Sequence, residues 1–173
     1  MMDPNVLHNL SYGMYIIGSN KDDALNAQIA NTVFQITSEP VSLAISINKK
    51  NLTHEYIDHS RHFTVSVLNE DAALPFIGKF GFKSGRTEDK FKDVNFRKLP
   101  SGCPVVTDCS ICYIEVKVTG SLDCGTHTVF LGEMTASEML KPGKPMTYDH
   151  YHLVKRGTTP KSAPTFIRGE KGV

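Results

Sequence analysis

The chain has 173 residues, 40% of them hydrophobic and 21% charged, a composition typical of one soluble globular domain. The formal net charge of +1 argues against a nucleic-acid-binding surface, which usually needs a strong basic excess. No apolar run approaches the ~20 residues of a membrane-spanning helix, and residues 1–10 lack the pattern of a signal peptide. We therefore expect a cytoplasmic protein whose four cysteines are reduced, with neither a nucleic-acid nor a membrane partner.

Strand signals dominate the first part of the chain. Apolar and polar residues alternate at period two, which places one face of a strand on a core and the other toward water or a ligand. The stretches with this character cover residues 12–18, 31–37, 41–48 and 63–68. Between the first two of them, the polar cluster at residues 19–26 predicts a turn.

Helical signals are fewer. Thr53 is a good N-cap for a short helix through His59, with Glu55 in its first turn, where negative charge suits the helix dipole. Apolar spacing over residues 71–80 predicts a second helix with Asp71 as its cap. The polar, glycine-marked residues 80–93 predict a surface loop or lid.

The second half of the chain returns to strands. Residues 111–121 and 128–134 are predicted to pair as a hairpin around a turn at residues 124–126. A short strand is expected at residues 151–155. We predict one domain over residues 1–157, followed by an extended arm, residues 158–173, that is ordered only if it docks. About six strands with two short peripheral helices predict a mainly β fold, a closed or partly closed antiparallel barrel.

The cysteines offer a rival hypothesis. Cys109 and Cys112 have the spacing of a redox or zinc-binding pair. Neither a second pair nor a nearby histidine pair completes a tetrahedral site, and on a strand the two thiols point to opposite faces. We predict no metal site. His150 and His152 would share one face of the expected short strand, which is a weak signal.

Several stretches, spread in order over roughly residues 5–155, resemble the flavin reductase-like FMN-binding family. They are residues 26–32 (NAQIANT), 48–57 (NKKNLTHEYI), 84–91 (SGRTEDKF) and 125–133 (GTHTVFLGE). The ending at 158–166 (TTPKSAPTF) is similar to the branch that includes high-molecular-weight rubredoxins and flavoredoxin-like proteins. The resemblance implies a Greek-key split β-barrel, usually a homodimer with FMN near the subunit interface.

Two segments are candidates for binding FMN. Its phosphate needs cations, hydroxyls and the backbone N–H groups of a helix start. Lysines and small polar residues lead into the helix predicted at Thr53, and the 84–91 loop adds a hydroxyl and a cation; the alternative is a solvated turn. The resulting phosphate candidates are Asn48, Lys49, Lys50, Asn51, Thr53, Ser84 and Lys90.

The flavin ring needs a flat apolar surface with hydrogen-bonding groups along one edge. In residues 26–32 the alanines let the backbone approach a ring, and the polar side chains supply edge contacts; the alternative is a polar strand start. The ring candidates are Asn26, Ala27, Gln28, Ile29, Ala30, Asn31 and Thr32.

His127 follows Gly125 at the mouth of the predicted hairpin. The resemblance places this histidine near the flavin and the nicotinamide, where it contacts either or steers a proton, so it is the candidate catalytic residue. An ordinary surface histidine is the alternative. Hydride transfer itself needs no protein acid or base, because the flavin carries that chemistry.

The resemblance implies an oxidoreductase that passes electrons from NADH or NADPH through FMN to free flavin or to a partner such as rubredoxin or a flavodiiron protein. A tight FMN-holding electron carrier, an FMN-binding module without turnover, and a pyridoxamine phosphate oxidase-like barrel remain alternatives. Because no Gly-x-Gly-x-x-Gly run is present, the nicotinamide has to stack directly on the flavin.

Overall fold

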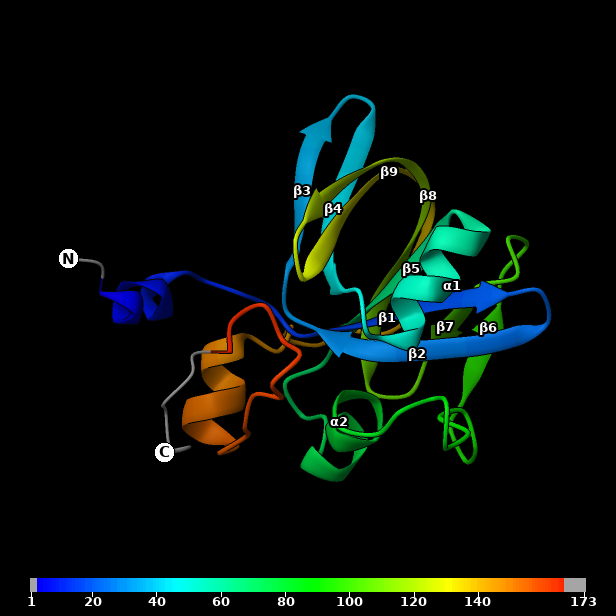
Figure 1. Ribbon diagram of the computed structural model, residues 1–173. Helices are drawn as coiled ribbons and strands as arrows, with labels where there is room; N and C mark the ends of the chain where they lie inside the picture. The colour runs from blue at the N-terminus through cyan, green and yellow to red at the C-terminus, as the bar shows by residue number, and fades with distance from the viewer. Residues whose placement is uncertain (1–2, 167–173) are drawn as a thin grey trace.

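Seven antiparallel strands form one strongly curled sheet in the computed structural model, which describes residues 3–166 (Figure 1). Their order across the sheet is β2-β1-β5-β8-β9-β4-β3. The strands are β1 (Tyr15–Lys21), β2 (Ala24–Ala30), β3 (Val33–Ser38), β4 (Val41–Asn48), β5 (His62–Leu68), β8 (Ser110–Cys124) and β9 (His127–Met139). A separate two-stranded sheet joins β6 (Phe96–Lys98) to β7 (Pro104–Val106). The predicted mainly β, antiparallel fold is confirmed.

The barrel is split beside β2 and β3. These two edge strands follow each other in the chain, joined by Asn31 and Thr32, yet they do not pair with each other. At the junction the Ser46 N–H of β4 donates to the Thr32 carbonyl at 3.2 Å. The end of β2 therefore lies next to β4, and the residues on either side of the split face a common space.

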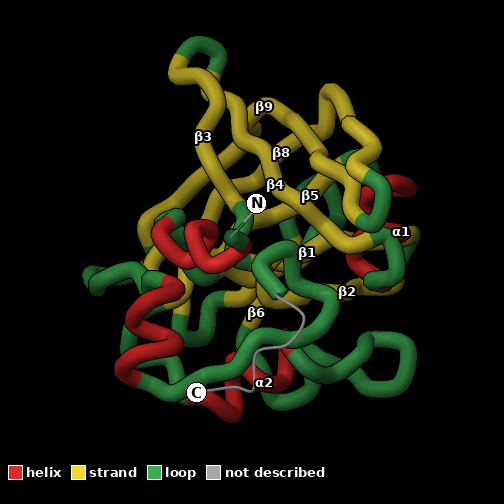
Figure 2. The backbone as a smooth tube through the Cα atoms, turned by 60° about the vertical axis from the view of Figure 1, so that its left-hand side comes forward, coloured by secondary structure: helices red, strands yellow, loops and turns green. Residues whose placement is uncertain are grey.

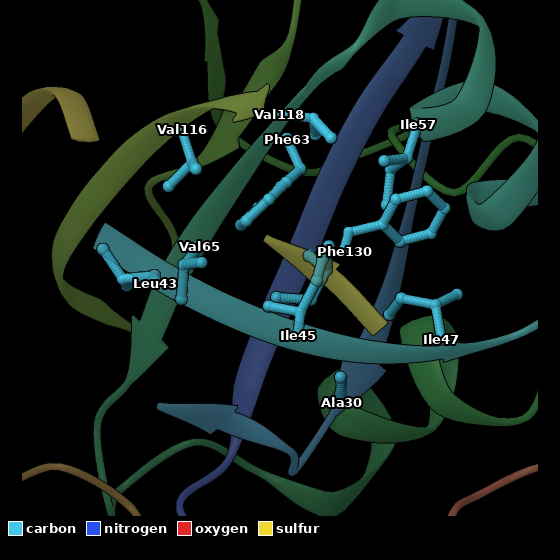
Figure 3. Packing of buried hydrophobic residues seen from close by; sticks show 11 residues of the cluster. Ala30, Leu43, Ile45, Ile47, Ile57, Phe63, Val65, Val116, Val118 and Phe130 are labelled. Atoms are coloured by element: carbon cyan, nitrogen blue, oxygen red, sulfur yellow. The ribbon is translucent and has the colours of Figure 1, made fainter. Parts of the chain in front are cut away.

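Two hydrophobic cores lie on opposite faces of β1. Ile17 joins the barrel interior, and its neighbour Ile16 joins an outer core under α2, as the two-residue period of a strand requires. Figure 3 shows the barrel interior, where Ile45 of β4, Phe63 of β5 and Phe130 of β9 converge. Each of these fully buried side chains contributes roughly 1.5–3 kcal/mol through apolar burial.

The helices lie outside the barrel. They are a 3-10 helix (Pro4–Asn9), α1 (Leu52–Ser60), α2 (Leu74–Gly81) and η2, a π-helix (His150–Val154). The predicted caps were wrong. Asn51 precedes α1, and Thr53 lies inside its first turn, with its hydroxyl accepting a hydrogen bond from Asn26 of β2. Ala73 precedes α2, so Asp71 lies outside that helix.

Two further expectations are corrected. The turn predicted at residues 19–26 is only the pair Asp22 and Asp23, because β1 and β2 extend almost to each other. Two of the polar residues that suggested a longer turn are buried and hydrogen-bonded: Ser19 donates to the His62 carbonyl of β5, and Asn26 donates to Thr53 of α1. The strand expected at residues 151–155 is the π-helix η2, so His150 and His152 do not share a strand face.

The last described segment, residues 158–166, turns back from η2 toward the end of β2 (Figures 1 and 2). It is the described part of the predicted arm; residues 167–173 lie outside the described residues. No described helix combines the length and hydropathy needed to cross a membrane.

Candidate functional site

A cavity of about 220 Å³ opens where the barrel is split. Its walls come from β2, the end of β4, the start of α1, the end of α2 with its following loop, η2 and the arm. Most of the predicted site residues line it: Asn26, Gln28, Ile29, Ala30, Asn31, Asn48, Lys50, Asn51, Thr53, Ser84 and Lys90. The fold thus brings the two predicted segments and part of the 84–91 loop to one space.

A buried hydrogen bond joins the two segments. The Asn26 Nδ2 atom of β2 donates to the Thr53 hydroxyl in the first turn of α1 at 2.7 Å. Asn26 is 2% exposed and Thr53 is fully buried. Such a bond in a water-excluded place fixes the strand and the helix start relative to each other.

Two acceptor atoms on the β2 wall have no partner. Among the described residues, Asn26 Oδ1 and Gln28 Oε1 are buried without a hydrogen bond. An unpaired buried polar atom costs about 1–3 kcal/mol, which is a reason to look for a ligand that satisfies it. A Cβ atom at Gly85 would overlap Asn26 Oδ1, so glycine allows the loop to lie against this wall. The wall therefore suits a planar ligand whose edge carries N–H donors.

The start of α1 forms the other end of the cavity. Asn51 makes no side-chain cap, so the first-turn N–H groups are not satisfied by that side chain. Lys50 lies beside this turn, and its backbone N–H donates to Asn48 Oδ1 at 3.0 Å. A helix start with free N–H groups and an adjacent ammonium is a suitable place for a phosphate.

Lys90 brings a buried ammonium to the same cavity. It is 6% exposed, and its Nζ donates to the carbonyls of Ala27 at 2.9 Å and Phe80 at 3.1 Å. Burial lowers the pKa of Lys90 to about 8, with Glu88 acting in the opposite direction. Because a lysine ammonium has three donors, these two carbonyls leave one for a ligand.

Four predicted residues lie outside the cavity lining. Lys49 turns toward the β8–β9 hairpin and pairs with Asp123 at 2.6 Å. Ala27 packs in the outer core, and the Thr32 hydroxyl donates to Asn31 Oδ1 at 3.0 Å. His127, the fourth, begins β9 opposite Asn48.

The His127 ring is held on both nitrogens. The Thr126 hydroxyl lies 2.8 Å from Nδ1, and Nε2 donates to the Ser162 carbonyl of the arm at 3.3 Å. A neutral imidazole with its proton on Nε2 satisfies both bonds. His127 therefore does not line the cavity itself but contacts Ser162, which does.

Sequence reasoning missed part of the lining. Tyr148 and Tyr151 come from the segment around η2, and the arm contributes residues including Thr158, Thr159 and Ser162. The likeness of 158–166 to a family branch was a signal that this segment matters. The two tyrosines gave no such signal, because their segment is rich in glycine and proline and shows no clear helical periodicity.

The cysteines form no cluster in this region. All four are free, and burial raises the pKa of the Cys109 and Cys112 thiols. Within residues 3–166, no group of three His, Cys, Asp or Glu side chains is arranged to hold a metal ion.

The curled antiparallel barrel with a cavity at its split is the architecture of flavin-binding split barrels. A flavoredoxin structure from Methanosarcina acetivorans shares this fold, with a TM-score of 0.68 at 20% identity over 79% of each chain. The model of the flavin reductase like domain matches residues 7–156, so the chain belongs to the flavin reductase-like family. The predicted family, and with it the oxidoreductase class and a flavin cofactor, is confirmed.

Two relatives match nearly the whole chain. A high molecular weight rubredoxin from Moorella thermoacetica is 51% identical over 170 residues, covering 98% of this chain and 74% of the relative. A ferric-chelate reductase (NAD(P)H) from Archaeoglobus fulgidus is 41% identical, covering 98% of this chain and 100% of the relative.

Proposed function

We propose that the cavity binds FMN and that the protein passes electrons from NADH or NADPH through it to an acceptor. One observation carries the proposal: the unpaired acceptors on β2 and the uncapped start of α1 face a single cavity. When bound, FMN would supply the redox chemistry, as the carrier that links hydride oxidation of the nicotinamide to reduction of the acceptor.

The residues divide into two roles. Asn26, Gln28 and Asn31 meet the polar edge of the ring, and Ile29 and Ala30 supply apolar surface beside it. Lys50, Asn51 and Ser84 hold the phosphate at the helix start, with Lys90 adding positive charge to the cavity. The start of α1 offers a place for the one phosphate of FMN.

The hydride donor stacks directly on the flavin. The chain has no dinucleotide-binding fingerprint, and the relative from Archaeoglobus fulgidus carries NAD(P)H in its name. His127, which is hydrogen-bonded to the cavity-lining Ser162, is our candidate for contacting the nicotinamide. The Ser162 carbonyl requires the N–H of the imidazole to lie on Nε2, and the Thr126 hydroxyl contacts Nδ1.

The acceptor is free flavin or an iron-containing redox partner. The names of the two relatives, a rubredoxin and a ferric-chelate reductase, support an iron centre in particular. An electron carrier that keeps its FMN is a second candidate function, favoured by the arm that lies across the cavity. The free cysteines support a reducing, cytoplasmic location.

A second copy of the chain is proposed to cover an apolar groove on the barrel. Half-buried side chains line this groove, together with Phe34, which is 51% exposed. An exposed apolar groove on a soluble barrel is typical of a protein interface. Sedimentation should give a dimer, and Phe34→Lys should shift it toward monomer; a monomeric wild type would contradict this part of the proposal.

The test of function is anaerobic mixing of the FMN-loaded protein with NADH or NADPH. The visible absorbance of oxidised flavin should bleach with one of the two donors and return when an acceptor is added. Failure to bind FMN would reject the site. If FMN binds but neither donor reduces it, the protein is better described as an FMN-binding module without turnover.

A further inference from the structure

The arm, residues 158–166, forms part of the cavity wall, because six of its residues, including Thr158, Thr159 and Ser162, line the cavity. Seven hydrogen bonds from side chains elsewhere tie it down within the described chain. None of the residues 158–166 is buried. A segment without fully buried side chains, fixed largely by side-chain hydrogen bonds, belongs to the less stable part of a fold and opens more readily than the core.

One end of the arm occupies polar groups of the proposed site. The Ser162 carbonyl accepts hydrogen bonds from Asn48 Nδ2 and His127 Nε2, both at 3.3 Å. Asn31 Nδ2 donates to the Thr165 hydroxyl at 2.8 Å. Asn31 and Asn48 are candidates for the flavin and His127 for its donor, so the closed arm and an incoming nicotinamide compete for the hydrogen bond of His127 Nε2.

Tyr148 anchors the arm from the other side. Its hydroxyl bonds to the hydroxyls of Thr159 and Thr165, the latter at 2.9 Å, while the Tyr151 hydroxyl donates to the Thr158 carbonyl at 2.9 Å. The two unpaired acceptors, Asn26 Oδ1 and Gln28 Oε1, are not among the groups that the arm engages. The arm thus leaves the β2 wall free for a ring while it closes the outer side.

We infer that the arm is a gate over the flavin, which a nicotinamide must displace before it can stack. The inference rests on the proposed function. With the arm closed, the flavin is retained and the hydride donor is kept away; with the arm open, His127 is released to meet the donor. The gate adds no chemical step, and Tyr148 acts in it as a positioning residue.

Thr165→Val tests the gate, because Thr165 bonds to both Asn31 and Tyr148 but does not line the cavity. Tyr148→Phe is the second variant, which keeps the ring and removes the hydroxyl. Tyr113→Phe is the matched control, since it removes a hydroxyl that bonds to Glu138 on β9. Circular dichroism confirms that each variant folds.

Two rates are measured by stopped flow on the FMN-loaded proteins: flavin reduction at low donor concentration and flavin dissociation. In Thr165→Val and Tyr148→Phe both rates should rise about fivefold, the effect of one lost hydrogen bond. The control should match wild type. Reduction that is unchanged or slower in both variants, with FMN still bound, would overturn the gate and leave the proposed function standing. Absence of FMN binding in wild type would overturn both.

Trypsin gives an independent readout on the full chain, because Lys161 lies exposed in the middle of the arm. Cleavage after Lys161 should be faster in Thr165→Val than in Tyr113→Phe, with or without flavin. Adding the oxidised nicotinamide to the FMN-loaded wild type should also speed cleavage, since it holds the arm open. Cleavage that slows under oxidised nicotinamide would overturn the gate.

Discussion

Asn26 Nδ2 on β2 donates a hydrogen bond of 2.7 Å to Thr53 Oγ1 in α1, and both side chains are buried. The ring wall and the phosphate end of the proposed site are therefore joined by one bond between residues 27 positions apart. Any change to that bond should alter the spacing of the two ends, and with it the fit of a ligand that must touch both.

Thr53→Val removes the acceptor and keeps the shape of the side chain. Because Asn26 Nδ2 is then left unpaired, we expect a loss of about 1–3 kcal/mol in the free energy of unfolding. In addition, the FMN affinity of the folded protein should fall about tenfold, measured by flavin fluorescence quenching. Thr64→Val is the matched control, since Thr64 is equally buried and bonds to the Pro104 carbonyl. An equal loss of FMN affinity in both variants would contradict the role of the Asn26–Thr53 bond.

The adjacent lysines should behave differently. Lys50 lines the cavity, but Lys49 pairs with Asp123 outside it. Lys50→Ala should weaken FMN binding about tenfold or more, the value of one charge-assisted hydrogen bond, while Lys49→Ala should change it little. Riboflavin, which lacks the phosphate, should bind both variants as it binds wild type. A larger effect of Lys49→Ala would place the phosphate elsewhere.

Lys90 should leave a signature in the pH dependence of stability. Its pKa is about 8 in the folded chain, owing to burial, against about 10.4 in an unfolded chain. Between these values the unfolded chain binds the proton that the folded chain has lost, so this contribution to stability rises with pH and is flat below about 8. Unfolding by urea should show the wild type gaining up to about 1.4 kcal/mol per pH unit relative to Lys90→Met.

The comparison with Lys90→Met is needed because other groups titrate in the same window. Burial raises the pKa of the Cys103 thiol, which makes its contribution to stability fall as pH rises above its unfolded value. That contribution is common to both proteins and cancels in the difference. A difference that stays constant from pH 7 to about 10 would show that Lys90 titrates normally in the fold.

Gly85→Ala should disrupt the ring wall. Its new Cβ would overlap Asn26 Oδ1, so either the loop or the amide must move. We expect FMN affinity to fall at least about tenfold, with a stability loss within the 1–3 kcal/mol typical of overpacking. Gly78→Ala in α2 is the control, because open space surrounds that position and alanine favours a helix. Wild-type FMN affinity in Gly85→Ala would mean that Asn26 does not meet the ligand.

The sequence predicted strands where one face is apolar and the other polar. β4 has the predicted bounds, residues 41–48. Its apolar and polar residues alternate, and the apolar ones pack in the barrel interior. The start of β2 was mistaken for part of a turn, since its polar residue Asn26 lines the cavity rather than facing water. Polarity alone does not separate a turn from a strand that builds a binding site.

Site residues that lie in short sequence motifs could be predicted. Those whose position depends on contacts between distant parts of the chain could not. The segments around Asn26 and Lys50 were found from residue types and family likeness, and the fold brings them together. The outward turn of Lys49 depends on Asp123, 74 positions away. The contribution of Tyr148 depends on the arm folding back, which no local pattern encodes.

A crystal structure of the protein with FMN tests the central claim most directly. Our account predicts the ring against β2, with its edge on Asn26 and Gln28, and the phosphate at the start of α1 beside Lys50. Flavin bound away from either of these segments, or a cavity left empty by FMN at saturating concentration, would contradict it.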